Sequence, residues 1–234
     1  MSTPPFLLED DERVIKAVAK EWCTLTNTEI LAWERDFTEM QAEQRDLAAN
    51  GAWVAGPADL LTIIGRSRRE TYHSAVIAWL LEPGGRHRLG TTFLRAILDK
   101  CLTEGEFDTD DLAACVTDTE VDAASSRADI VVSGPGLHLV IEVKVDAAEG
   151  PNQCQRLFDD HNGSEAGFVF LTPSGGEPRS CNDDIRAVWA PLSFGWIANE
   201  LENLMASQAE QIATDMAARG TVRSYLATLR KEFR

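Results

Sequence analysis

The stretch that most constrains the fold is LHLVIEVKVD, residues 137–146, in which apolar and polar side chains alternate. The odd-numbered residues from Leu137 to Val145 are all aliphatic, and a period of two places them on one face of a β-strand. This pattern predicts a strand that lies against a core. The other face is unusual, because Glu142 and Lys144 follow each other on it near the end of a strongly apolar strand.

A second strand is predicted over residues 127–132 (RADIVV), followed by a turn at residues 133–136 (SGPG). Proline presets φ and glycine permits a positive φ, so both residue types favour turns. If these four residues form the hairpin loop, Asp129 opposes Val140. Asp129 then shares a face with Glu142 on the diagonal, where Cα atoms are about 7–8 Å apart. Two carboxylates at this spacing can bind one hard cation, with a lysine ammonium beside them.

Asp129 followed by Glu142-Val143-Lys144 resembles the core motif of the PD-(D/E)XK nuclease superfamily, which has the restriction-endonuclease-like fold. Ala128 stands where the motif has proline, and many members of the superfamily lack that proline. The resemblance implies that Asp129, Glu142 and the backbone carbonyl of Val143 bind Mg²⁺, with Mn²⁺ as a substitute. It also implies that Lys144 deprotonates or positions the attacking water, with a pKa that the nearby metal lowers.

The segment ETYHSAVIAWLL predicts a helix over residues 70–81. The pattern E-x-x-H-S, W-L-L-x-P, H-x-x-G and F-L that begins here resembles a bacterial branch of uncharacterised or defence-associated nucleases. In nucleases of this fold a glutamate on the first core helix often joins the metal site, which implies Glu70 as a third carboxylate. The alternative is a helix N-terminal charge favoured by the helix dipole. His73 is either a nucleic-acid contact or a core histidine.

Gly150-Pro151 suits the start of a further helix, because proline at the first helical position loses no hydrogen bond. Gln153 then lies in the first turn, beside the strand end that carries Lys144. The resemblance implies that Gln153 orients the lysine or a phosphate, and the alternative is a polar cap. Arg127 either contacts a phosphate or pairs with Glu142 on the same face.

From Glu70 onward the predicted elements run helix, three strands, helix, strand, strand, helix. This order fits a restriction-endonuclease-like α/β fold with an α-β-β-β-α-β core and a central mixed sheet flanked by helices. Residues 66–234 are the predicted nuclease domain, and residues 1–65 a helical extension. Three helices are expected in the extension, over 10–22, 28–50 and 58–64, with Thr26 as a cap. A lid, a partner surface and a recognition module all remain open for it.

The chain has 38 acidic and 22 basic residues and a net charge of −16, whereas a nucleic-acid binder usually shows a basic footprint. Arginines cluster at residues 66–69 and 86–88, and such a patch can act locally because screening limits charge effects to about 8–10 Å. The candidate nucleic-acid contacts are Arg69, His73, Arg88 and Arg127.

Two functions are compatible with the sequence. The first is a Mg²⁺-dependent DNA endonuclease serving phage defence, and the second is an inactive member of the fold that binds a protein through its acidic surface. DNA is the expected partner, a protein partner or a second copy is left open, and no run approaches the ~20 apolar residues of a membrane span. An acidic start and five cysteines without CxxC spacing favour the cytoplasm.

Overall fold

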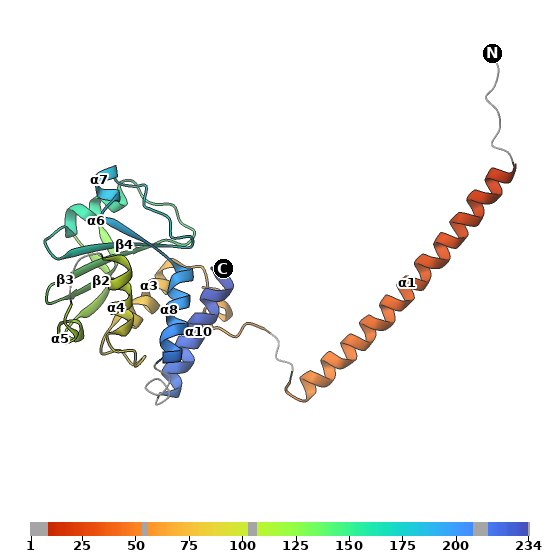
Figure 1. The fold of residues 1–234 in the computed structure, drawn as a ribbon, viewed down its shortest axis with the longest axis horizontal. Coiled ribbons are helices and arrows are strands. Elements are labelled where there is room, and N and C mark those ends of the chain that lie inside the picture. The colour runs from red at the N-terminus through yellow and green to blue at the C-terminus, as the bar shows by residue number, and fades with distance from the viewer. Residues whose placement is uncertain (1–8, 53–55, 103–106, 208–214, 234) are drawn as a thin grey trace, which may run out of the picture. The chain divides into compact units, whose positions relative to one another are not determined.

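The apolar runs in the second half of the chain form a five-stranded sheet whose spatial order follows the sequence. Its strands are β1 (Val116–Asp122), β2 (Arg127–Gly134), β3 (Leu137–Val143), β4 (Ala166–Thr172) and β5 (Trp189–Ser193). The β1–β2 and β2–β3 pairs are antiparallel, whereas β3–β4 and β4–β5 are parallel, so the sheet is mixed. The computed structural model describes residues 9–52, 56–102, 107–207 and 215–233 (Figure 1).

Helices cover both faces of this sheet (Figure 1). The helices from residue 57 onward are α2 (Leu60–Ile63), α3 (Glu70–Leu81), α4 (Thr92–Cys101), α5 (Thr109–Ala113), α6 (Gln153–His161), α7 (Asp183–Arg186), α8 (Phe194–Ser207) and α10 (Met216–Glu232). The order α3, β1, β2, β3, α6, β4 confirms the predicted α-β-β-β-α-β core of a restriction-endonuclease-like fold. A closing helix was expected at the end of the predicted order; α10 forms it, and residues 208–214 lie outside the described residues.

The alternation in β3 sorts its side chains between two cores, as predicted. The odd-numbered residues pack in the larger core with α3, α4 and α8, where Ile141 and Val143 are fully buried. Val140 packs in a second core with Cys154 and Leu157 of α6. Because both faces of the sheet are covered, Glu142 has to be accommodated on the buried α6 side rather than in open solvent.

The β2–β3 hairpin has a tighter turn than the sequence predicted. Only Pro135 and Gly136 lie between the strands, and Val131 rather than Asp129 is opposite Val140. Gly134 belongs to β2 and pairs with Leu137, and a Cβ there would lie 2.4 Å from the sulfur of Cys115. The register is therefore shifted by two residues, which keeps every side chain on its predicted face. Ile130 pairs with Ile141, so Asp129 comes level with Glu142.

The chain divides into two units, residues 1–56 and 57–234, whereas the sequence placed the boundary after residue 65. The difference arises from α2, which belongs to the second unit. Asp59 caps this helix by accepting from the Thr62 amide at 2.8 Å, and it accepts from the Thr228 hydroxyl of α10 at 2.5 Å. In the described residues no helix is both long and apolar enough to cross a membrane.

Over its described residues the first unit contains a single helix, α1 (Glu9–Ala49), so the prediction of separate helices at 10–22 and 28–50 was wrong. Thr26 does not cap a second helix. Its hydroxyl donates to the carbonyl of Trp22 at 2.8 Å, and Thr24 and Thr28 make the same bond four residues back. The threonines are therefore satisfied within a continuous helix.

Candidate active site

The end of β3 brings two acids and one base together on the face that α6 covers. The Oδ2 atom of Asp129 on β2 accepts from the backbone N–H of Val143 at 2.8 Å, which directs its carboxylate across to β3. Glu142 is fully buried, and its Oε1 accepts from the ammonium of Lys144 at 2.6 Å. Its Oε2 atom is buried without any hydrogen-bond partner. The structure thus brings Asp129, Glu142 and Lys144 to one place, as their spacing predicted.

Burial controls the charge of the two acids. Burial and then the charge of Asp129 raise the pKa of Glu142 to about 8, despite the opposing effect of Lys144. The pKa of Asp129 is also raised, chiefly by burial, although the Val143 N–H lowers it. Two buried acids that both resist ionisation favour a cation between them, because a cation would stabilise the ionised forms.

Lys144 is held in its protonated form. Burial lowers its pKa, but the charges of Glu142, Asp129 and Glu70 outweigh burial and leave the pKa raised. The resemblance to nucleases predicted that a neighbouring metal lowers the pKa of Lys144. In the metal-free site this pKa is raised instead, because three carboxylates surround the ammonium. The same ammonium lies 3.4 Å from the carbonyl oxygen of Val143, so that carbonyl also faces the site.

Gln153 begins α6 and bonds directly to Glu142. Its Oε1 accepts from the Gly150 N–H at 3.0 Å, which fixes the orientation of the amide. Its Nε2 therefore donates to Oε1 of Glu142, at 2.5 Å, the same oxygen that Lys144 contacts. The amide orients the glutamate itself, rather than the lysine or a phosphate as the sequence predicted.

If Glu142 holds the metal of a nuclease, as the resemblance implies, replacing Gln153 by alanine should lower the cleavage rate by about 10–100-fold, because the partner behind a metal ligand is lost. The amide donates to the ionised carboxylate, so its loss should raise the pKa of Glu142 further and shift the rate profile to higher pH. Rates from pH 6 to 9 test this. Gln155→Ala is the matched control, since Gln155 bonds Asp159 and Asn182 instead. An unshifted profile would contradict this role.

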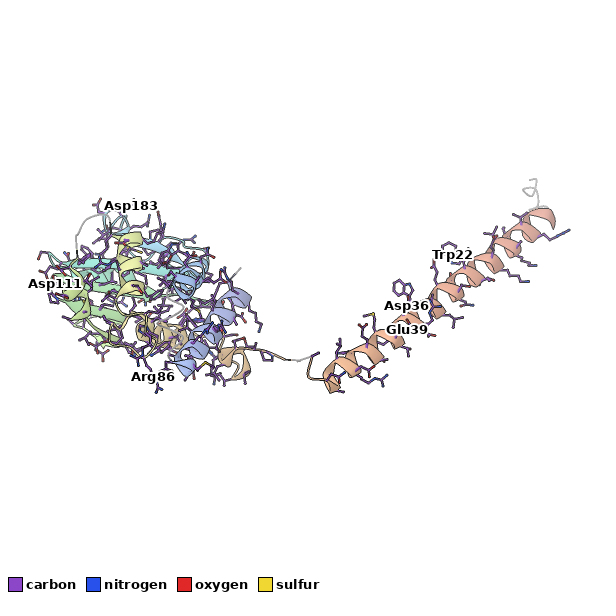
Figure 2. All side chains as sticks on the ribbon, turned by 60° about the horizontal axis from the view of Figure 1, so that its bottom comes forward. Trp22, Asp36, Glu39, Arg86, Asp111 and Asp183 are labelled. Atoms are coloured by element: carbon purple, nitrogen blue, oxygen red, sulfur yellow. The ribbon has the colours of Figure 1, made fainter. Side chains whose placement is uncertain are left out.

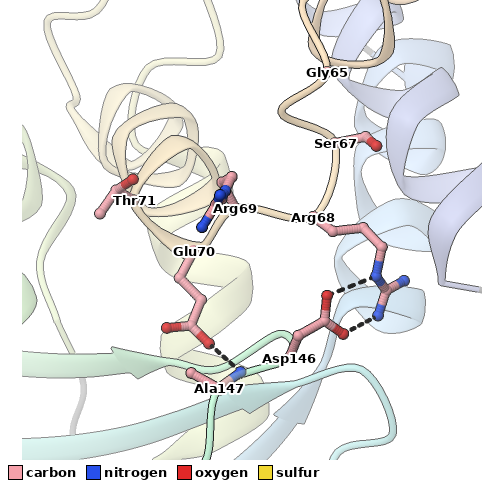
Figure 3. Close-up of a pocket in the computed structure, with 8 residues that line it drawn as sticks. All are labelled: Gly65, Ser67, Arg68, Arg69, Glu70, Thr71, Asp146 and Ala147. Carbon is pink, nitrogen blue, oxygen red and sulfur yellow. Dashed lines mark hydrogen bonds and ion pairs between the residues drawn. The ribbon is translucent and has the colours of Figure 1, made fainter.

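Glu70, the first residue of α3, lies beside the two acids but is used differently. Its Oε1 accepts from the backbone N–H of Val145 at 2.8 Å. The same oxygen accepts from the backbone N–H of Ala147 at 3.2 Å (Figure 3). Its Oε2 is 3.8 Å from the ammonium of Lys144. Within the described residues, no three His, Cys, Asp or Glu side chains are grouped to hold a metal. Glu70 therefore fixes the chain after β3, and its role as a third ligand stays a prediction.

A cavity of about 330 Å³ opens over Asp129 and Lys144, while the fully buried Glu142 is not part of its lining. Arg127 lies at its rim and pairs with Glu120 at 2.8 Å, not with Glu142. Glu120 and Arg156 also line the cavity, and the sequence did not single them out as site residues. Glu120 has a φ of 54°, which is an uncommon backbone conformation for a glutamate. The neighbouring sequence does not predict this conformation. The cavity is lined by Glu70, Thr71, Glu120, Ser126, Arg127, Asp129, Lys144, Gln153 and Arg156.

A second cavity of about 460 Å³ adjoins the first, since Glu70 and Thr71 line both (Figure 3). Arg69 lies on its wall and is exposed. Arg68 lies there too, but its guanidinium bonds the carboxylate of Asp146, with a 2.8 Å contact from Nε. Arg69 is thus the cation of this cluster that the fold leaves best placed for a phosphate.

The structure does not bring the other two candidate nucleic-acid contacts to the site. His73 is fully buried, with its ring nitrogens 3.0 Å from the Tyr225 hydroxyl and 2.9 Å from the Ser67 carbonyl. It is a core histidine and has no surface to offer to a nucleic acid. Arg88 is exposed but follows the far end of α3, a helix about 18 Å long that begins at Glu70.

Residues 58–227 match the family model of the PD-(D/E)XK nuclease superfamily. The chain belongs to the PD-(D/E)XK nuclease superfamily. No curated protein and no solved structure matches it. The matched region contains the whole sheet and both cavities, and it leaves α1 outside. Membership in a nuclease superfamily supports a metal-dependent nuclease as the activity of the second unit.

Proposed function

We propose that the chain is a metal-dependent endonuclease that hydrolyses phosphodiester bonds of DNA. The observation that carries this proposal is the buried, unpartnered Oε2 of Glu142 beside Asp129 and Lys144. An unpaired buried oxygen costs about 1–3 kcal/mol, so most carboxylates that serve structure alone have both oxygens bonded. Neighbouring acids whose pKa burial raises, one of them lining a cavity, are typical of functional sites.

The oxygen atoms present fit a hard divalent cation. Asp129 and Glu142 would hold Mg²⁺ or Mn²⁺ with the carbonyl of Val143, which suits the preference of these ions for oxygen ligands. When bound, such an ion polarises the phosphate and lowers the pKa of a water molecule. Glu70 as a further ligand is part of this proposal.

Lys144 would position the attacking water and offset the charge that develops on the phosphorane. Its raised pKa supports this role better than that of a general base, since the surrounding carboxylates keep it protonated. Gln153 would hold the Glu142 carboxylate in place while the ammonium moves toward the phosphate, because the amide bonds the same oxygen.

Arg127 and Arg69 would contact the substrate's phosphates on either side of the scissile bond, since they line the two adjoining cavities. Phosphate contacts position a nucleic acid without reading its sequence. The choice of DNA over RNA and a role in phage defence rest on the resemblance to defence-associated nucleases. The net charge of −16 should keep nonspecific binding weak.

Covalently closed substrates test this function. Wild-type protein should cut supercoiled plasmid with Mg²⁺ or Mn²⁺ and not with EDTA. Asp129→Asn should lower the rate by about 10³-fold, the loss expected when several kcal/mol of metal-dependent stabilisation disappear. Asp118→Asn, an exposed aspartate of β1, is the matched control. Circular single-stranded DNA and RNA tested alongside would identify the substrate class.

The alternative is an inactive member of the fold that binds a protein through its acidic surface. Calorimetry with Mn²⁺ separates the two functions. If no nucleic acid is cut and the wild type and Asp129→Asn bind Mn²⁺ equally weakly, the nuclease proposal fails and the binding function is favoured.

A further inference from the structure

α1 carries a stripe of large apolar side chains that its own unit does not cover. Eight of them lie on one side of the helix, and each is at least half exposed, up to 71% for Trp22 and 79% for Trp33. Figure 2 shows Trp22 projecting from the helix. The eight are Ile15, Val18, Trp22, Leu25, Ile30, Trp33, Phe37 and Met40. A helix gains most of its stability from packing such a face, so α1 is expected to pack against a partner.

The spacing of these residues is symmetric. The first four follow one another at intervals of three, four and three residues, and so do the last four, from Ile30 to Met40. Reversing the helix about the midpoint between Asn27 and Thr28 places Trp22 on Trp33 and superimposes the whole set on itself. At 3.6 residues per turn all eight fall within a sector of about 140°. This symmetry is what an isologous antiparallel contact between two identical helices needs.

The charges of the two halves are complementary in the same arrangement. Residues 13–20 contain three basic residues and no acidic one, and residues 35–42, which lie opposite them in this arrangement, contain two acidic residues and one arginine. In a parallel pair, like charges would lie beside each other at both ends. In an antiparallel pair, the basic segment of each helix lies beside the acidic segment of the other, and such flanking charges set the orientation of paired helices.

We propose that α1 pairs with α1 of a second copy of the chain as an antiparallel two-helix coiled coil. Its two-fold axis passes between Asn27 and Thr28, so Trp22 of each copy packs near Trp33 of the partner subunit. This assigns to α1 the partner surface that the sequence left open, and it does not depend on the proposed nuclease activity.

The mass of the full chain in solution is the first test. Sedimentation should give twice the chain mass of 25.7 kDa. The double substitution Trp22→Glu with Trp33→Glu should give the monomer, with the thermal transition of the second unit unchanged. Leu31→Glu is the matched control, since Leu31 is 65% exposed but lies on the other side of the helix, and it should stay dimeric. A monomeric wild type, or a dimeric double variant, would overturn the proposal.

Distances between spin labels test the orientation in the full chain with Cys23 replaced by serine. A label at Asn27→Cys should lie close to its copy, at about the 10 Å separation of packed helices plus the label arms. A label at Gln41→Cys should lie about 40 Å from its copy, because 27 residues separate the two along the axis. Short distances for both labels would indicate a parallel pair and would refute the antiparallel arrangement.

Discussion

Replacing Glu142 by glutamine is expected to stop cleavage and, at the same time, to stabilise the metal-free protein at pH 8. The side chain is fully buried, and glutamine has nearly the same shape, so packing changes little. Cleavage should fall by about 10³-fold or more, because the variant loses an anionic oxygen that would hold the metal. A gain in stability combined with a loss of activity would mark Glu142 as a residue retained for function.

The direction of the stability change follows from the difference between the pKa of Glu142 in the folded and in the unfolded protein. The pKa of Glu142 is about 8 in the folded protein, whereas a glutamate in an unstructured chain has a pKa of 4.5. The unfolded state therefore ionises first, and this residue makes the folded protein progressively less stable as pH rises from 4.5 to 8. The whole effect corresponds to about 5 kcal/mol. Asp129, whose pKa is also raised, contributes in the same direction.

Thermal and urea unfolding in EDTA between pH 5 and 8.5 measures this effect. The wild type should lose stability across the range, and Glu142→Gln should have a flatter profile. Mg²⁺ should restore stability to the wild type at pH 8 but not to the variant, because it binds the ionised carboxylates. Glu202→Gln, an exposed glutamate paired with Arg230, should keep the wild-type profile. A wild-type stability that is constant from pH 5 to 8 would contradict the assignment.

The sequence predicted those parts of the site that depend on local periodicity. The alternation in β3 placed Glu142 and Lys144 on one face, and a register error of two residues in the hairpin left that face unchanged. The register itself was not predictable, because glycine is common in turns and the sequence therefore predicts Gly134 in the loop. Its actual role is to admit the sulfur of Cys115, a contact with the segment that precedes β1.

Features that depend on distant partners could not be read from the sequence. His73 is enclosed by the rings of Phe194, Tyr225 and Phe233, all far along the chain in α8, α10 and the residue after it. The arginine clusters looked like a basic patch, but Arg68 bonds Asp146, which is 78 residues away. Because of such long-range ion pairs, fewer arginines are available to bind a phosphate than the sequence alone suggests.

Replacing Lys144 by methionine is expected to separate metal binding from catalysis. The ammonium lies 2.6 Å from Oε1 of Glu142 and competes for it with any cation that the two acids hold. Removing the ammonium should strengthen the binding of Mn²⁺ by roughly tenfold or more, because a positive charge leaves the site. Cleavage should nevertheless fall by about 10²–10⁴-fold, since no group remains to position the water or offset phosphorane charge.

Calorimetric titration with Mn²⁺ and plasmid cleavage, measured on the same preparations, decide between this role and a structural one. A lysine that only balances buried charge would, when lost, leave two acids unpaired, and metal alone would then restore cleavage. Lys231→Met removes an exposed lysine of α10 and should change neither measurement. Weaker Mn²⁺ binding in Lys144→Met, or full cleavage at saturating metal, would show that the ammonium has no part in hydrolysis. Tighter binding with lost cleavage is the result that the proposed roles of Asp129, Glu142 and Lys144 predict.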